Sequence, residues 1–100
     1  MGGTSIRKKV SGMTMVDTWP VEISLHEDDG QTRAEARLAR GGADMTGHGL
    51  ARRHPGDREV TQIGEEIAAA RALSDLAHQL LSDAAGQIEG ITHERAHLSL

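Results

Sequence analysis

The stretch "HERAH", residues 93–97, carries the residue types of a zinc protease with the spacing H-E-x-x-H. On a helix this spacing puts two imidazoles one turn apart on one face, where both can bind one zinc ion while the glutamate activates the bound water. A catalytic site also needs a third protein ligand and a supported helix beside a cleft. Only three residues follow His97, and the other histidines fall in two expected strands, a loop and the polar side of an expected helix: His26, His48, His54 and His78. We therefore expect a solvent-facing tail without catalytic zinc, and adventitious metal binding by His93 and His97 is the alternative.

Other catalytic patterns are weaker. The segment "GHGLARR", residues 47–53, lacks the third glycine of a dinucleotide fingerprint, and no segment matches the phosphate-binding pattern G-x-x-x-x-G-K. No serine or threonine stands in a recognisable nucleophile elbow. The sequence predicts a protein that is not an enzyme, with no catalytic residues, no cofactor, no metal and no small-molecule substrate.

Composition limits the size of the core. The chain has 100 residues, a single aromatic residue, Trp19, and no cysteine. A chain of this length forms one domain and buries roughly two thirds of the surface it exposes when unfolded. No run approaches the ~20 apolar residues that a membrane span requires, and no signal peptide is evident, so we expect a cytoplasmic protein that does not bind membranes.

Charge is unevenly distributed around a net value of −4. From residue 33 to residue 58, six arginines oppose three acids, which gives +3, whereas from residue 59 onward seven acids oppose two arginines, which gives −5. A basic band in an acidic molecule is typical of solvated strand faces and loops, and the alternative is a surface for phosphate groups. The band consists of Arg33, Arg37, Arg40, Arg52, Arg53 and Arg58.

Alternating apolar residues predict three antiparallel strands. "WPVEISLH" (residues 19–26) and "TRAEARLAR" (residues 32–40) alternate with period two, and "EDDGQ" between them supplies a tight turn in which Gly30 accepts a positive φ. Pro20 indicates an edge or entry position, because proline cannot donate to the ladder. "GGAD" makes the next turn, and "MTGHGLAR" (residues 45–52) forms the third strand. Its two glycines share a face, which indicates that another element packs closely there.

A long helix is predicted over residues 60–85, with Asp57 or Thr61 as the cap and Gly86 as its end. Its apolar residues form two stripes, the first with Ile63, Ile67, Ala70, Ala77 and Leu81, and the second with Ala69, Leu73, Leu76 and Leu80. Together they span about half of the circumference, more than one sheet covers. One stripe therefore faces the sheet and the other a partner, which predicts a homodimer with Leu73, Leu76 and Leu80 in its interface. Arg71 is expected to be a structural arginine in a salt bridge, with an interface role as the alternative.

The words "WPVEISL", "TRAEARL", "GHGLARRHPGDREV", "IGEEIAAARALSDL" and "ITHERAHL" lie in order with almost no gaps. In these words the chain resembles a family of small actinobacterial proteins of unknown function with a dsRBD-like fold, over about residues 18–98. The resemblance implies a homodimer and a link to the hypoxia and dormancy response. It also implies a likeness to ribosome hibernation-promoting factors, which occupy the small ribosomal subunit.

The sequence thus predicts an α+β fold in which a three-stranded antiparallel sheet precedes one long helix and a short C-terminal element. Residues 1–17 are expected to be a flexible tail, and residues 18–100 a single dsRBD-like domain. The leading functional prediction is a non-enzymatic dormancy factor that binds ribosomal or other structured RNA through the six arginines of the basic band. The alternative is a protein-interaction module, in which the second helix stripe and the loop "RRHPGDR" engage a protein and RNA has no part.

Overall fold

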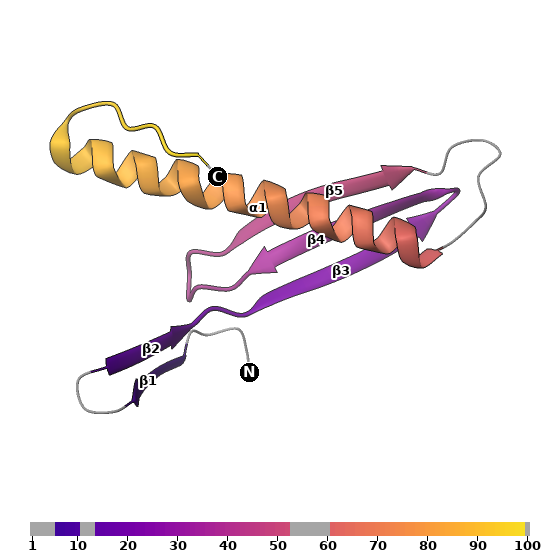
Figure 1. Cartoon of the computed structure of the whole chain (residues 1–100), viewed down its shortest axis with the longest axis horizontal. Helices are drawn as coiled ribbons and strands as arrows, with labels where there is room; N and C mark the ends of the chain where they lie inside the picture. The colour runs from indigo at the N-terminus through magenta and orange to yellow at the C-terminus, as the bar shows by residue number, and fades with distance from the viewer. Residues whose placement is uncertain (1–5, 11–13, 53–60, 100) are drawn as a thin grey trace.

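In the computed structural model, a long helix lies diagonally across one face of a three-stranded antiparallel sheet (Figure 1). The structure describes residues 6–10, 14–52 and 61–99. The sheet has the order β3-β4-β5, with β3 at Val21–Asp28, β4 at Gln31–Leu38 and β5 at Met45–Arg52. The helix α1 spans Thr61–Thr92. The predicted α+β architecture of three strands followed by one long helix is confirmed.

Turn residues fix the strand register. Asp29 and Gly30 have φ angles of 50° and 76°, which suits a two-residue hairpin turn, because such turns need positive φ at both central positions. The turn sets Asp28 opposite Gln31 and Val21 opposite Leu38. Gly41 and Gly42, also at positive φ, carry the chain from β4 into β5. The predicted turns at both places are confirmed.

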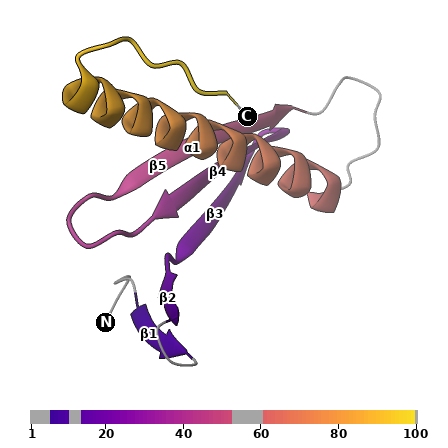
Figure 2. The ribbon, with the colours of Figure 1, turned by 60° about the vertical axis from the view of Figure 1, so that its left-hand side comes forward.

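The core lies between the helix and the side of the sheet that it covers, as a second view shows (Figure 2). Every second residue of β4 is buried on that side: Thr32, Ala34, Ala36 and Leu38. The helix contributes Ala68, Ala72 and Leu76, which follow one another at intervals of four residues and therefore lie on one face. Small residues dominate both layers, so the helix backbone comes very close to the sheet.

Gly47 and Gly49 of β5 make this close approach possible. A Cβ atom on Gly47 would lie 2.5 Å from the backbone nitrogen of Leu76, and one on Gly49 would meet the backbone of Ala68 and Ala72. No side chain fits in either place. The prediction that an element packs closely against these glycines is confirmed, and that element is the helix.

The helical face that is buried shares only Leu76 and, in part, Leu80 with the predicted stripes. Ala68 and Ala72 belong to neither stripe, yet they are fully buried, whereas Ile63, Ile67 and Leu73 remain 55%, 40% and 42% exposed. The close approach at the two glycines selects alanine for the contact and turns the larger side chains away from the sheet. The helix also continues through Gly86 to Thr92, because a glycine inside a helix costs only about 1 kcal/mol.

The segment predicted as a flexible tail contains two paired strands. β1 at Ile6–Val10 pairs with β2 at Thr14–Thr18 in a separate two-stranded sheet. β-branched residues recur along both strands and favour extended backbone, which the glycines and the basic triplet of the segment obscure in the sequence. This pair of strands projects away from the main sheet in Figure 1.

The C-terminal end of α1 extends past the sheet (Figures 1 and 2). A helix of 32 residues is about 48 Å long at 1.5 Å per residue, whereas a strand of 8 residues covers about 27 Å. The segment after Thr92 turns back toward the sheet and forms no second helix. The described part of the chain holds no helix long and apolar enough to cross a membrane.

Candidate interaction surfaces

Three of the six predicted arginines share the face of the sheet that the helix does not cover. Because successive side chains of a strand point to opposite faces, Arg33 and Arg37 of β4 and Arg52 of β5 lie opposite the buried alanines. All three are exposed. This surface, formed by the side chains of β3, β4 and β5 that point away from the helix, is called the outer face below.

Carboxylates alternate with these arginines on the outer face. Glu22 of β3 lies directly opposite Arg37, and Glu35 stands between Arg33 and Arg37 on the same strand. Asp28, opposite Gln31, belongs to the same row as Arg52. Arg37 also pairs at 3.5 Å with Asp44 in the turn before β5. The outer face therefore has about as many negative as positive groups, which leaves little net positive charge for a polyanion.

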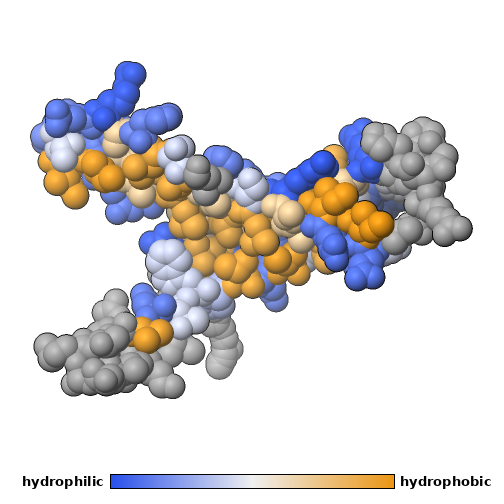
Figure 3. All heavy atoms as spheres, in the orientation of Figure 1, coloured by the Kyte–Doolittle hydropathy of each residue, from blue (hydrophilic) through white to orange (hydrophobic). Residues whose placement is uncertain are grey.

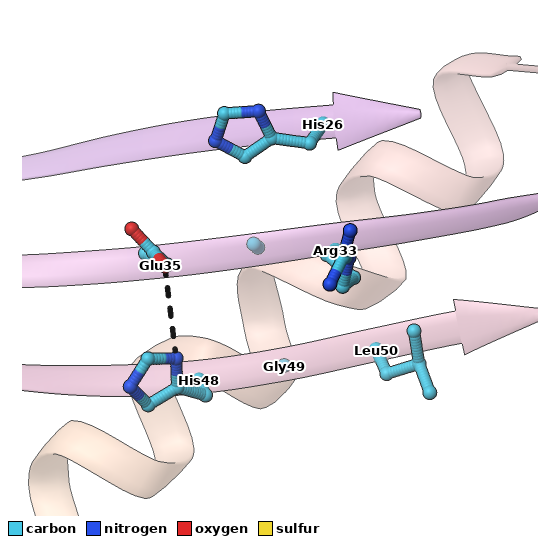
Figure 4. A pocket seen from close by; sticks show the side chains of 7 residues that line it. His26, Arg33, Glu35, His48, Gly49 and Leu50 are labelled. Carbon is cyan, nitrogen blue, oxygen red and sulfur yellow. Dashed lines mark ion pairs between the residues drawn. The ribbon is translucent and has the colours of Figure 1, made fainter. Parts of the chain in front are cut away.

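A shallow hollow lies at the centre of the outer face (Figure 4). The side chains of His26, Arg33, Glu35, His48 and Leu50 surround it, and Ala34 and Gly49 also line it. Nδ1 of His48 lies 4.0 Å from a carboxylate oxygen of Glu35, and both side chains are more than half exposed. An exposed pair of this kind contributes little to stability. The hollow is open and polar, without a buried charge.

Arg40 does not join this group. The guanidinium of Arg40 stacks over the ring of Trp19 at 4.4 Å, and the backbone N–H of Arg40 donates to Asp44 at 3.1 Å. Arg53 and Arg58 lie outside the described residues. Arg71 has a structural contact, as expected, but its partner is the backbone carbonyl of Leu50 at 2.6 Å and not a carboxylate.

The helix leaves the apolar side of β3 uncovered. Val21, Ile23 and Leu25 lie opposite Leu38, Ala36 and Ala34, so they face the same side as the core. They are nevertheless 44%, 39% and 38% exposed. The reason is the position of α1, which packs against β5 and β4 and makes few contacts with β3.

The exposed flank of the helix continues this apolar surface. Arg71 reaches the edge of β5, and Leu73, two residues further along the helix, points to the opposite flank, above β3. We call Val21, Ile23, Leu25 and Leu73 the apolar strip. Apolar side chains of the sheet and of the helix gather on the face of the molecule that Figure 3 shows. Ile63 and Ile67 of the helix are also exposed. Contiguous exposed apolar surface commonly marks an interaction site.

The three leucines predicted for a dimer interface occupy different environments. Leu73 is exposed and belongs to the apolar strip. Leu80 is partly buried against the core, and Leu76 is 4% exposed inside the core of the single chain. Leu76 therefore stabilises the fold itself, and only Leu73 offers a large free surface to a second molecule.

The tail histidines do not have the geometry of a zinc helix. α1 ends at Thr92, and His93 takes a left-handed conformation with φ 61° while its N–H donates to the carbonyl of Glu89 at 2.7 Å. His93 and His97 are therefore not on consecutive turns of a helix. Among the described residues, no three His, Cys, Asp or Glu side chains are grouped closely enough to hold a metal ion.

Comparison with known proteins gives consistent matches over most of the chain. A family model described as Rv2632c-like matches residues 17–97. The Mycobacterium tuberculosis protein Rv2632c, named as uncharacterized, is 49% identical over 77 residues, which cover 77% of this chain and 83% of the relative. The uncharacterized protein Mb1767 of Mycobacterium bovis is 48% identical over 80 residues, which cover 80% of this chain and 85% of the relative. The crystal structure of Rv2632c superposes with a TM-score of 0.71 and covers 77% of this chain and 92% of that one.

Proposed function

The chain belongs to the Rv2632c-like family, and because that family is one of unknown function, we propose from its surfaces that the protein is a non-enzymatic protein-interaction module that associates through the apolar strip. The observation that carries this proposal is the exposure of Val21, Ile23 and Leu25 on the core side of the sheet. These side chains have the pattern of buried residues, but no element in the described part of the chain covers them.

The cost of leaving the strip in water supports a partner. Full burial of a Val, Ile or Leu side chain contributes about 1.5 to 3 kcal/mol, and each residue of the strip retains close to two fifths of its exposure. The core of the single chain is meanwhile built mostly from alanine, which contributes less per residue. A partner that covers the strip would therefore add substantially to the stability of a small domain.

The charge of the outer face favours protein over RNA as the partner. Binding to a phosphate backbone depends on the number of phosphates that cations neutralise. Arg33, Arg37 and Arg52 are interleaved with Glu22, Glu35 and Asp28, which would repel a phosphate brought close to the arginines. The residues of the apolar strip carry no charge, so no charge repulsion opposes the binding of an apolar protein surface there.

The test is the assembly state of two charge variants on the same helix. Leu73→Glu places a carboxylate in the strip and should weaken self-association or partner binding at least tenfold, because burial of an unpaired charge is strongly unfavourable. Ser82→Glu adds the same charge at an exposed position on the other flank of α1 and should have no effect. Sedimentation velocity across micromolar concentrations measures both, and circular dichroism verifies that each variant is folded. A wild-type protein that stays monomeric and is indistinguishable from Leu73→Glu would contradict the proposal.

A second candidate function is binding of ribosomal or other structured RNA, in the manner of the hibernation factors to which the family resemblance points. Its supporting observation is that Arg33, Arg37 and Arg52 lie exposed on one open face of the sheet. A dormancy role would follow if this face bound the small ribosomal subunit. In a dimer, two such faces would double the number of cations.

Salt dependence separates the two candidates. If RNA binds, log Kd should vary with log salt concentration with a slope of several units, and Arg33→Ala with Arg37→Ala should reduce this slope by about one unit per lost phosphate contact. Glu35→Gln removes an interleaved carboxylate and should strengthen the binding. If the protein fails to co-sediment with 30S subunits at low salt, the RNA proposal fails.

A further inference from the structure

The strands β1 and β2 form a unit that stands apart from the main sheet, and we call this pair of strands the arm. They contact each other and no other strand or helix of the described chain. Figures 1 and 2 show the arm projecting from the start of β3. An isolated pair of strands is at most marginally stable in water. A partner that bound the arm would therefore add to its stability.

The arm carries positive charge on an otherwise acidic molecule. Residues 1–18 contain three basic residues and one acid, Asp17, which gives +2, whereas residues 19–100 contain 8 basic residues and 14 acids, which gives −6. The three basic residues are Arg7, Lys8 and Lys9, all in β1. A positive segment on a negative body attracts a polyanion and directs it to that segment. The arm thus differs from the outer face, where acids alternate with the arginines.

The single aromatic side chain of the protein lies at the inner end of the arm, where β2 leads into β3. Trp19 follows β2 directly and is 45% exposed. The guanidinium of Arg40 stacks over its ring, and the N–H of Arg40 donates to Asp44 in the turn before β5. These contacts fix the orientation of the ring and leave much of its surface accessible. An exposed aromatic ring beside cations is the arrangement on which single-stranded nucleic acids stack their bases.

Strand register connects the ring with the basic residues of the arm. Ile6 is level with Thr18, the residue before Trp19, so β1 begins at the inner end of the arm. The basic triplet follows Ile6 directly and extends about 10 Å outward, at about 3.4 Å per residue. Basic positions therefore continue from the stack of Trp19 and Arg40 along β1. A strand of nucleic acid that places a base on the ring would run its phosphates past this triplet.

We propose that the arm and Trp19 bind single-stranded nucleic acid, with a base stacked on the Trp19 ring and the phosphates along β1. This inference goes beyond the proposed function, because the apolar strip belongs to the main sheet and its helix. The match to the family model begins at residue 17, so the arm adds this function to the domain that the family shares. A duplex fits less well, because its bases stack on one another and not on a protein side chain.

Fluorescence anisotropy of labelled oligonucleotides with the full chain tests the phosphate contacts. An oligouridine and an oligothymidine of about 12 nucleotides should both bind at low salt, because stacking and phosphate contacts tolerate either sugar and any base. Lys8→Ala with Lys9→Ala should weaken binding at least tenfold and lower the slope of log Kd against log salt concentration by about 0.7 for each lost phosphate contact. The matched control Arg33→Ala with Arg52→Ala removes two cations from the outer face and should leave the affinity nearly unchanged.

Trp19 reports on the stacking itself, because it is the single tryptophan. Its fluorescence should be quenched when either oligonucleotide binds. Trp19→Ala should weaken binding at least fivefold, which corresponds to the low end of base–aromatic stacking energies. Trp19→Phe keeps an aromatic ring and should restore most of the affinity. Circular dichroism verifies that each variant is folded.

Three results would overturn the proposal. The first is the absence of binding to both oligonucleotides at low salt. The second is an equal loss of affinity in Arg33→Ala with Arg52→Ala, which would make the outer face the binding site. The third is equally tight binding of heparin, a polyanion without bases, or of a duplex of the same length, because charge alone would then explain the binding. None of these results bears on the apolar strip, which is tested by the assembly state of Leu73→Glu.

Discussion

Gly47→Ala should destabilise the protein through the contact between β5 and the helix. The added Cβ would lie 2.5 Å from the nitrogen and 2.9 Å from the Cα of Leu76, whereas ordinary van der Waals contact begins at 3.4 Å. Neither neighbour is a flexible side chain, so the helix as a whole has to move away by about 1 Å. A gap of that size loses a quarter to a half of the dispersion energy of the atoms around it.

The expected loss of stability is about 3 to 5 kcal/mol. Overpacking of a tight core costs about 1 to 3 kcal/mol, and the hydrogen bonds of Asp75 and Gln79 to the edge of β5 weaken when the helix moves, at about 1 kcal/mol each. For a domain of this size 1 kcal/mol corresponds to about 4 to 8 °C in Tm. Thermal unfolding at one fixed protein concentration should therefore show a Tm lower by at least about 10 °C.

Gly86→Ala is the matched control. Gly86 lies inside the same helix, and a Cβ there meets nothing within 4 Å. The identical chemical change should stabilise the helix by about 0.5 to 1 kcal/mol, because alanine has the higher helix propensity. If Gly47→Ala unfolds at the same temperature as Gly86→Ala, the reasoning from close packing is wrong.

Three further outcomes are expected. Leu38→Ala removes a large, fully buried side chain and should cost about 2 to 5 kcal/mol in chemical denaturation, whereas a loss below about 1 kcal/mol would mean that the core is elsewhere. Arg40→Ala should change the fluorescence of Trp19, the single tryptophan, but lower stability by only about 0.5 to 1 kcal/mol, because an exposed cation–π contact is weak; an unchanged spectrum would count against the stacking. Zinc should leave the Tm unchanged, because His93 and His97 are not on consecutive helical turns, and a stoichiometric zinc lost in His93→Ala would disprove this.

The strands could be predicted from the sequence because local rules determine them. Period-two alternation located β4, the Asp29–Gly30 pair fixed the hairpin, and the two glycines of β5 indicated a close neighbour. Each signal depends on residues only a few positions apart, so it can be recognised without knowledge of the tertiary structure.

The buried face of the helix could not be predicted in the same way. Hydropathy favours the stripe with the larger side chains, but Gly47 and Gly49 bring the helix so close that only the small row of Ala68 and Ala72 fits. The hydropathy pattern also placed Leu76 in the predicted dimer interface, whereas the structure places it in the core of the single chain.

The balance of positive and negative charge on the outer face could not be predicted from the sequence either. A count along the chain finds an excess of arginine between residues 33 and 58, but strand pairing brings Glu22 from outside that segment directly opposite Arg37. Which edge of the sheet is free also depends on tertiary contacts, since Arg71, Asp75 and Gln79 of the helix bond to the edge of β5.

Amide hydrogen exchange in β3 tests the central claim most directly, because that claim assigns association to the apolar strip, which includes Ile23 and Leu25. The amides of Ile23 and Leu25 should be protected at high protein concentration and lose that protection on dilution and in Leu73→Glu, while the amide of His48, bonded to Asp75, stays protected at every concentration. Rapid exchange of Ile23 and Leu25 at every concentration in the wild-type protein, with His48 protected as expected, would contradict the account.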